Sequence, residues 1–124
     1  MKAGIRFHIR DSRNTTGLAI GPGKVALLEA IDETGSITSA AKKLGISYRR
    51  AWLLVDETNR CVVRPAVETA AGGPNGGGAV LTPVGVLLVR RYRALELRTE
   101  AAVARKLKSI LRTLPPGTDR STRR

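Results

Sequence analysis

The most constraining feature of the sequence is a glycine turn between two short helix-forming segments. Residues 37–44 form an alanine-containing amphipathic segment, and Gly45 stands where a helix would end. Ser47, a favourable N-cap residue, then precedes a further helical segment over residues 48 to 59 or 62. Two helices of this size joined by a glycine-containing turn of about three to four residues are typical of a helix-turn-helix.

The segment before this pair also predicts a helix, over residues 24–34. Val25, Leu28 and Ile31 recur at steps of three, and Gly35 occupies the position of a left-handed C-terminal residue. We expect the Gly21 to Gly23 segment to break the chain before this helix.

On the third helix the spacing predicts an inward, buried stripe. The stripe consists of Ala51, Trp52, Val55 and either Thr58 or Asn59. Trp52 is therefore interpreted as a core residue rather than a nucleic-acid contact.

The N-terminal region predicts a strand or a short hairpin. Residues 5–10 alternate strictly between apolar and polar side chains, as in a half-buried strand, and residues 18–20 are suited to return as a second one. Two further strands are expected, at residues 67–71 and 79–81, around a glycine-rich loop at residues 72–78. A hairpin in this place, directly after a helix-turn-helix, is a wing. The loop lacks the Gly-Lys-Ser/Thr ending of a nucleotide-binding P-loop.

A long C-terminal helix is predicted from Thr82, a cap followed by Pro83, to about residue 112. Its apolar side chains recur at helical spacing over more turns than one small core can cover, which predicts that a second copy of the chain covers them. The residues assigned to this dimer contact are Leu88, Tyr92, Leu95, Val103, Leu107 and Ile110.

These elements predict an α+β fold: a winged helix-turn-helix with an N-terminal strand or short hairpin and a long C-terminal dimerisation helix. Residues 1–82 would form the DNA-binding domain, residues 83–114 the dimerisation helix, and residues 115–124 a basic flexible tail.

The helix-turn-helix and wing regions resemble the N-terminal DNA-binding domain of ModE-type molybdate-responsive transcriptional regulators over roughly residues 22–95. The matching pieces occur in order: Gly35-Ser36-Ile37, Ala40-Ala41, Gly45-Ile46-Ser47-Tyr48, Ala51-Trp52, Gly72-Gly73, Gly76-Gly77-Gly78-Ala79, Leu81-Thr82 and Gly85.

The resemblance implies a winged helix-turn-helix that binds DNA and dimerises through helices outside its reading head. In that family, oxyanion-binding domains follow on the C-terminal side, and we expect this chain to lack them and to bind no molybdate. Ser12, Arg13 and Asn14 echo an oxyanion motif of molbindin-type domains, but a turn between strands is the favoured interpretation.

The helix-turn-helix pattern assigns DNA contacts to three places. Tyr48, Arg49 and Arg50 open the helix that would enter the major groove, where arginine pairs bidentately with guanine. The second helix and the wing would contact phosphates. The complete predicted set is Ser36, Thr38, Ser39, Lys42, Lys43, Ser47, Tyr48, Arg49, Arg50, Gly73, Asn75 and Gly76.

The charge of the chain also favours nucleic acid as its partner. The net charge is +12, and residues 81–124 alone carry 11 basic and 3 acidic side chains. A sequence-specific regulator acting as a homodimer on double-stranded DNA is the main hypothesis. The alternatives are a non-specific nucleoid-type or RNA-binding basic protein and an adaptor that holds an acidic partner.

Catalysis, cofactors and metal ions are not expected. Cys61 and His8 are each the only residue of their type, and no Ser/His/Asp set, paired carboxylates or metal-spaced ligands can be assembled. No apolar run approaches the ~20 residues that span a bilayer, so we expect no membrane association and a cytoplasmic location.

Overall fold

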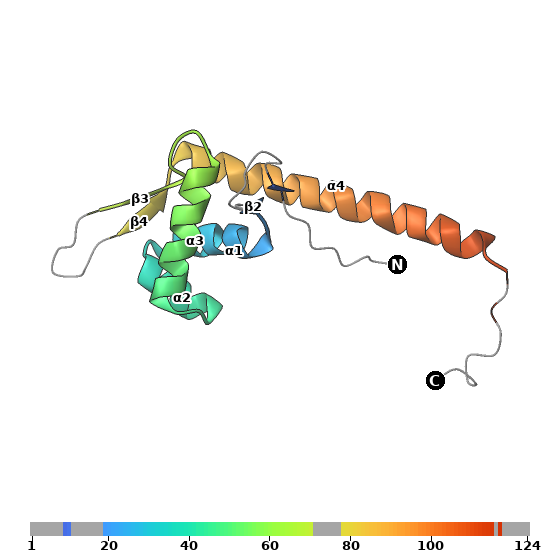
Figure 1. Ribbon diagram of the computed structural model, residues 1–124, viewed down its shortest axis with the longest axis horizontal. Coiled ribbons are helices and arrows are strands. Elements are labelled where there is room, and N and C mark those ends of the chain that lie inside the picture. The colour runs from blue at the N-terminus through green and yellow to red at the C-terminus, as the bar shows by residue number, and fades with distance from the viewer. Residues whose placement is uncertain (1–8, 11–18, 71–77, 116, 118–124) are drawn as a thin grey trace.

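Three short helices pack against one another, and the first of them packs against a fourth helix that extends far beyond them (Figure 1). The computed structural model describes residues 9–10, 19–70, 78–115 and 117. The elements are β1 (Ile9–Arg10), β2 (Ala19–Ile20), α1 (Pro22–Thr34), α2 (Ile37–Leu44), α3 (Tyr48–Cys61), β3 (Val67–Thr69), β4 (Ala79–Leu81) and α4 (Pro83–Thr113). The fold is thus the predicted α+β arrangement of a helix-turn-helix, a hairpin and a long helix.

The first helix begins two residues earlier than its periodicity predicts. Gly21 is its N-cap, and Pro22 occupies the first helical position. Proline suits that position because its missing N–H would have no partner inside the helix. The expected break over residues 21–23 was therefore wrong for Pro22 and Gly23, which belong to the helix.

Two left-handed glycines set the turns of the helix-turn-helix. Gly35 ends α1 with φ of 73°, and Gly45 ends α2 with φ of 69°. A side chain in this conformation is strained, so glycine is favoured at both turns. The hydroxyl of Ser36 caps α2 and the hydroxyl of Ser47 caps α3, each accepting a backbone N–H three residues on.

The core lies where α1, α2 and α3 meet beneath the hairpin. Leu28, Ile31, Ala40 and Ala51 are fully buried there. Burying a leucine or isoleucine side chain stabilises a fold by about 1.5–3 kcal/mol. The main cluster consists of Leu27, Leu28, Ala30, Ile31, Ile37, Ala40, Ala41, Ala51, Val55, Ala66, Val67 and Ala79.

The hairpin is anchored to the helix-turn-helix at the start of β4. Strands β3 and β4 pair antiparallel, with Val67 opposite Leu81 and Thr69 opposite Ala79. The N–H of Ala79 donates to the carbonyl of Gly35, the turn between α1 and α2, at 2.9 Å. The wing and the helix-turn-helix therefore share a backbone contact.

A side chain of α3 secures the other end of the hairpin. The amide oxygen of Asn59 accepts the backbone N–H groups of Ala66, at 2.8 Å, and Val67, at 3.1 Å. The sequence left open whether Thr58 or Asn59 belongs to the buried stripe of α3, and Thr58 is the buried one. Asn59 instead orients the start of β3.

Helix α4 crosses the hairpin in close contact with the backbone. The Thr82 hydroxyl accepts the N–H of Gly85 and donates to the carbonyl of Pro65. A Cβ atom at Gly85 would collide with the carbonyl oxygen of Ala66. The first turn of α4 therefore requires glycine.

Two residues differ from their predicted environment. Trp52, expected in the core, is 38% exposed, whereas Tyr92, expected at a dimer contact, is 1% exposed. Tyr92 packs within the protomer against Ile20 and Val25, on the side of α1 where β2 ends. It is unavailable to a second copy, and its assignment to the dimer contact was wrong.

Candidate nucleic-acid interface

The N-terminal turn of α3 presents two arginines to solvent. The Ser47 hydroxyl accepts the N–H of Arg50 at 3.0 Å, which fixes where the helix begins. Arg49 and Arg50 are exposed, and neither forms an ion pair with a described residue. Their guanidinium groups are therefore open to an anion or a base edge.

The N-terminus of helix α2 is a second helix end with exposed polar residues. Ser36 accepts the N–H of Ser39 at 3.1 Å, and Thr38 and Ser39 are exposed. The hydroxyl groups at this end lie where the helix dipole favours an anion. The structure thus brings Ser36, Thr38 and Ser39 together, in accord with their shared predicted role.

The two lysines at the other end of α2 differ from each other. Lys42 is exposed and has no ion pair within the described part of the chain, whereas Lys43 pairs with Glu33 of α1. The pair is solvent-exposed, and such pairs contribute little to stability. Lys43 therefore already has a counter-charge, and Lys42 is the better candidate for a phosphate contact.

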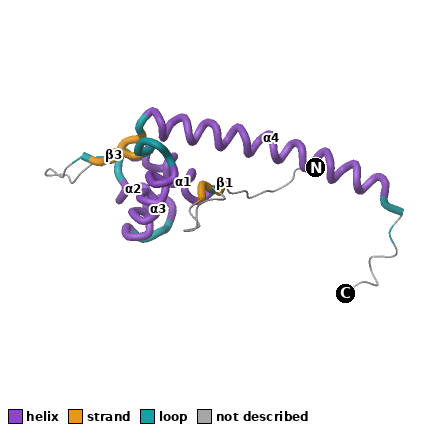
Figure 2. The backbone as a smooth tube through the Cα atoms, turned by 45° about the horizontal axis from the view of Figure 1, so that its top comes forward, coloured by secondary structure: helices purple, strands orange, loops and turns teal. Residues whose placement is uncertain are grey.

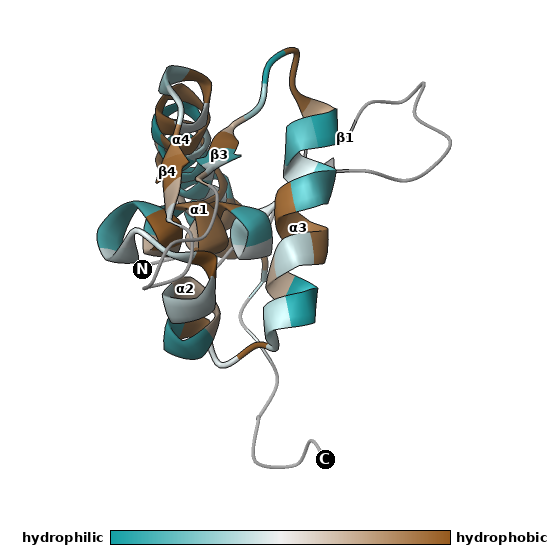
Figure 3. Ribbon diagram, turned by 90° about the vertical axis from the view of Figure 1, so that its left-hand side faces the viewer, coloured by the Kyte–Doolittle hydropathy of each residue, from teal (hydrophilic) through white to brown (hydrophobic). Residues whose placement is uncertain are grey.

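The predicted wing-tip contacts, Gly73, Asn75 and Gly76, lie outside the described residues. The base of the wing is described: Gly78 is exposed and Val80 is 58% exposed. Figure 3 shows the hairpin and α3 on the same side of the molecule, with the N-terminal end of α3 next to α2.

Apolar side chains accompany the arginines on α3, and among them sequence reasoning missed the exposure of Trp52. Tyr48 is 53% exposed, Trp52 38% and Leu53 48%. The rings of Tyr48 and Trp52 meet edge to face, with centroids 6.2 Å apart and an interplanar angle of 75°. The signal in the sequence was the position of Trp52 at the border of the buried stripe, one residue after Ala51.

The exposed apolar stripe of α4 starts later than predicted. Leu88 packs partly against both core clusters, so its side chain also belongs largely to the protomer. Leu95, Val103, Leu107 and Ile110 are 39–45% exposed. All four come after Arg93, which pairs with Glu29 of α1, and Figure 2 shows the later part of α4 extending beyond the other helices.

An ion-pair cluster holds the middle of α4 against α1. The Arg93 guanidinium donates to both carboxylate oxygens of Glu29, at 2.8 and 3.1 Å, and to Glu96 at 2.7 Å. Its hydrogen bonds to Glu29 raise the pKa of Arg93 above its ordinary value. Burial, and next the charge of Glu96, raises the pKa of the adjacent Tyr92. Helix α4 is therefore fixed to α1 through Arg93.

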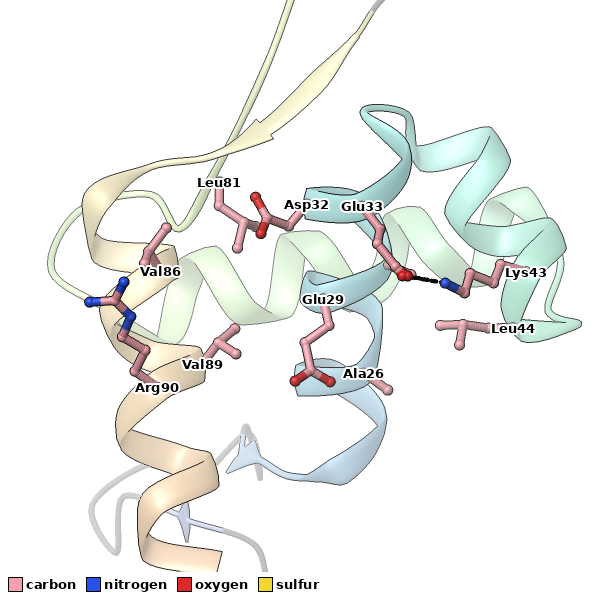
Figure 4. Close-up of a pocket in the computed structure, with 11 residues that line it drawn as sticks. Ala26, Glu29, Asp32, Glu33, Lys43, Leu44, Leu81, Val86, Val89 and Arg90 are labelled. Atoms are coloured by element: carbon pink, nitrogen blue, oxygen red, sulfur yellow. Dashed lines mark hydrogen bonds and ion pairs between the residues drawn. The ribbon is translucent and has the colours of Figure 1, made fainter.

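A cavity of about 610 Å³ lies between α1, α2, β4 and α4 (Figure 4). Apolar side chains such as Leu44 and Val89 line it, with Glu29 and Asp32 across from Arg90. The Glu33–Lys43 ion pair lies at its border. Its lining contains no histidine, cysteine or hydroxyl group, so it offers no side-chain nucleophile of these types.

Two other classes of site are absent from the described parts of the chain. No group of three or more His, Cys, Asp or Glu residues is placed to hold a metal ion. None of the described helices combines the length and the apolar character needed to cross a membrane.

Comparison with known proteins identifies relatives over most of the chain. The molybdenum-pterin-binding protein MopB of Rhodobacter capsulatus is 46% identical over 99 residues, which cover 80% of this chain and 35% of the relative. The molybdenum transport protein ModE of Azotobacter vinelandii is 43% identical, covering 81% and 37%. The DNA-binding transcriptional dual regulator ModE of Escherichia coli K12 is 45% identical over 74 residues, covering 60% and 28%.

The chain spans about a third of the length of these relatives. No protein-family model matches it.

A solved structure supports the same type of fold. The full-length LysR-type regulator LysG of Corynebacterium glutamicum, solved with its effector arginine bound, superposes with a TM-score of 0.52 at 26% identity. The superposition covers 76% of this chain and 30% of LysG. LysR-type regulators carry a winged-helix DNA-binding fold. The sequence relatives are thus ModE- and MopB-type molybdate-responsive regulators, and the match is consistent with their N-terminal winged helix-turn-helix domain alone.

Proposed function

We propose that this chain is a sequence-specific DNA-binding transcriptional regulator that acts as a homodimer in the cytoplasm. Helix α3 enters the major groove, α2 and the wing contact the backbone, and the outer half of α4 joins the two subunits. The relatives support the regulatory class, since two of those compared bear the name ModE and one is named a DNA-binding regulator.

The observation that carries the proposal is the exposed, unpaired Arg49 and Arg50 on the capped first turn of α3. In helix-turn-helix proteins this is the end of the helix that contacts base edges. Because α2 leads through Gly45 into this turn, one docking pose of the helix-turn-helix presents base-reading and phosphate-binding groups together. A basic protein that binds by charge alone needs no such arrangement.

The homodimer is supported by the apolar side chains on the outer half of α4. Leu95, Val103, Leu107 and Ile110 are exposed in one protomer and fall on one side of the helix. A second copy covers them without any rearrangement of the head. In such a dimer the two α3 helices enter successive major grooves about 34–36 Å apart, and the preferred site is a pseudo-palindrome.

The chain is divided by role along the same lines. Residues 1–82 would supply the reading head, residues 83–114 the dimer contact and residues 115–124 a basic tail. The first part of α4 additionally supports the head through Gly85 and Tyr92. The similarity of the matched segment thus supports DNA recognition. We assign the segment neither a molybdenum ligand nor a catalytic role.

Selection of bound fragments from random duplex DNA and from genomic DNA tests this proposal. A regulator enriches particular sites by large factors, whereas a nucleoid-type protein enriches none. Arg49→Ala and Arg50→Ala should each reduce the ratio of specific to random affinity, by about 1–3 kcal/mol for a lost bidentate base contact.

Two control variants separate base reading from charge. Lys42→Ala should weaken specific and random binding alike and make the slope of log affinity against log salt shallower by about one unit. Arg91→Ala removes an exposed charge on α4 and should change neither quantity much. If both α3 variants leave the ratio unchanged, α3 does not read bases and the charge-driven alternative is favoured.

A further inference from the structure

The outward side of α3 combines basic and apolar side chains. Tyr48, Trp52 and Leu53, called here the apolar ridge, are 53%, 38% and 48% exposed in a chain whose net charge is +12. Exposed aliphatic and aromatic groups are unfavourable in water, and they gather next to the arginines of the proposed reading surface. They therefore call for a ligand with apolar groups of its own.

Helical spacing places the apolar ridge directly beside the arginines. Residues four apart are neighbours on a helix surface, so Tyr48 precedes Trp52 in one row and Arg49 precedes Leu53 in the next. The opposite side of the helix is buried through Ala51. The edge-to-face contact with Tyr48 orients the indole of Trp52 along the outward side.

In its major groove, DNA offers such a surface one suitable chemical group. The base edges there present hydrogen-bond donors and acceptors, and thymine alone adds an apolar group, its 5-methyl. We infer that Trp52 and Leu53 bind thymine 5-methyl groups, so that α3 reads thymine by apolar contact beside the guanines read by Arg49 and Arg50. This inference rests on the proposed function.

A protein ligand fits this surface less well. The apolar ridge occupies the same turns of α3 as the arginines, and a partner protein seated there would exclude DNA from it. The protomer already exposes a separate apolar stripe on the outer half of α4, which is suited to a second copy.

Thymine-to-uracil substitution tests the inference. The probe is a duplex that the protein itself selects from a random library, compared with the same duplex carrying deoxyuridine at one thymidine at a time. Uracil keeps every hydrogen-bonding group of thymine and lacks only the methyl. At one or two positions of each half-site, deoxyuridine should weaken binding about fourfold, the factor for one buried methyl-sized group.

Substitutions on the protein complete a double-mutant cycle. In Trp52→Ala or Leu53→Ala the selected duplex should bind more weakly, and deoxyuridine at the contacted position should then have little further effect. Leu87→Ala is the matched control. Leu87 lies on α4, and it is 49% exposed where Leu53 is 48% exposed. This variant should keep the full preference for thymine.

Fluorescence gives an independent measurement, because Trp52 is the only tryptophan in the chain. Its emission should shift to shorter wavelength when the selected duplex binds, and it should shift less when deoxyuridine occupies the contacted position. Trp52→Phe, which keeps an apolar ring, should retain a larger preference for thymine than Trp52→Ala.

The outcomes separate this inference from the function on which it rests. Enriched sites that are insensitive to uracil at every thymine overturn the methyl contact and leave the regulator intact. A preference for thymine that persists in both Trp52→Ala and Leu53→Ala also overturns it. Selection that enriches no sequence removes the proposed function and this inference together. Thermal unfolding shows whether the two variants are folded at the temperature of the binding measurement, which excludes misfolding as the cause.

Discussion

The head and the outer half of α4 contain the same types of apolar residue, but these residues are buried in the head and exposed on α4. In the head, Val25, Leu28 and Ile31 of α1 are fully buried within one protomer. On the outer half of α4, Val103, Leu107 and Ile110 recur at the same helical spacing but remain 39–43% exposed. The comparison teaches that an apolar stripe indicates a covered surface without saying which molecule covers it.

The boundary between the two regions lies within α4, near residue 96. Up to that point Gly85 contacts the hairpin, Tyr92 fills the core beside Val25, and Arg93 binds Glu29. Beyond it no α4 residue is buried. The described part of the protomer thus leaves the last part of the helix uncovered, and the following predictions test this division.

A matched pair of isoleucines gives the largest expected contrast. Ile31→Ala removes a fully buried side chain from the head and should lower the free energy of unfolding by about 2–5 kcal/mol. Ile110→Ala, at 43% exposure, should cost much less at protein concentrations low enough to keep the chain monomeric. Urea unfolding over a range of protein concentrations measures both. Equal losses at low concentration would show that the outer half of α4 is not independent of the head.

Gly85→Ala tests whether the start of α4 belongs to the head. The added methyl collides with the carbonyl oxygen of Ala66, so the helix or the start of β3 must shift. Overpacking of this kind typically costs about 1–3 kcal/mol, which thermal unfolding detects. Gly23→Ala is the control, because a Cβ at Gly23 meets nothing within 4 Å. A fully stable Gly85→Ala variant would contradict the close approach.

Leu107→Glu tests whether a second copy covers the outer half of α4. A carboxylate buried between two helices without a partner is strongly unfavourable, so the dissociation constant of the dimer should rise at least about tenfold. Sedimentation equilibrium measures it. Leu97→Glu is the matched control, because Leu97 is 68% exposed and lies outside the predicted apolar series. If both variants dissociate alike, the apolar series does not define the contact.

The smallest expected effect concerns Tyr92 and alkaline pH. Its pKa is raised in the folded chain, chiefly by burial, above the ordinary value of 10.0. The folded state therefore retains the phenol proton where the unfolded chain loses it, so this stabilisation is present below pH 10.0 and is lost as pH rises through the folded pKa. Urea unfolding between pH 9 and pH 11, by about half-unit steps, should show a steeper decline for the native chain than for Tyr92→Phe. Parallel slopes would place Tyr92 at an exposed position.

Much of the architecture could be predicted because its signals are local. The bounds of α2 agree with the prediction, and those of α3 fall within it, since Gly35 and Gly45 end helices and Ser36 and Ser47 begin them. The hairpin strands and the long α4 also lie where expected, although β3 ends at Thr69 and Ala70 lies outside it. The DNA-contact assignments at the start of α3 remain predictions, although the structure leaves Arg49 and Arg50 accessible.

The sequence by itself determined the order of the elements, the turns between them and the residues that open each helix. These depend on backbone conformation and on hydrogen bonds that span only a few residues. Only the tertiary structure decided that Trp52 is exposed, that Tyr92 is buried, and that Lys43 pairs with Glu33. Helical spacing gives the direction of a side chain about the helix axis, but the neighbouring elements decide whether anything stands in that direction. At the edge of a stripe, where Trp52 lies, that decision belongs to residues far away in the sequence.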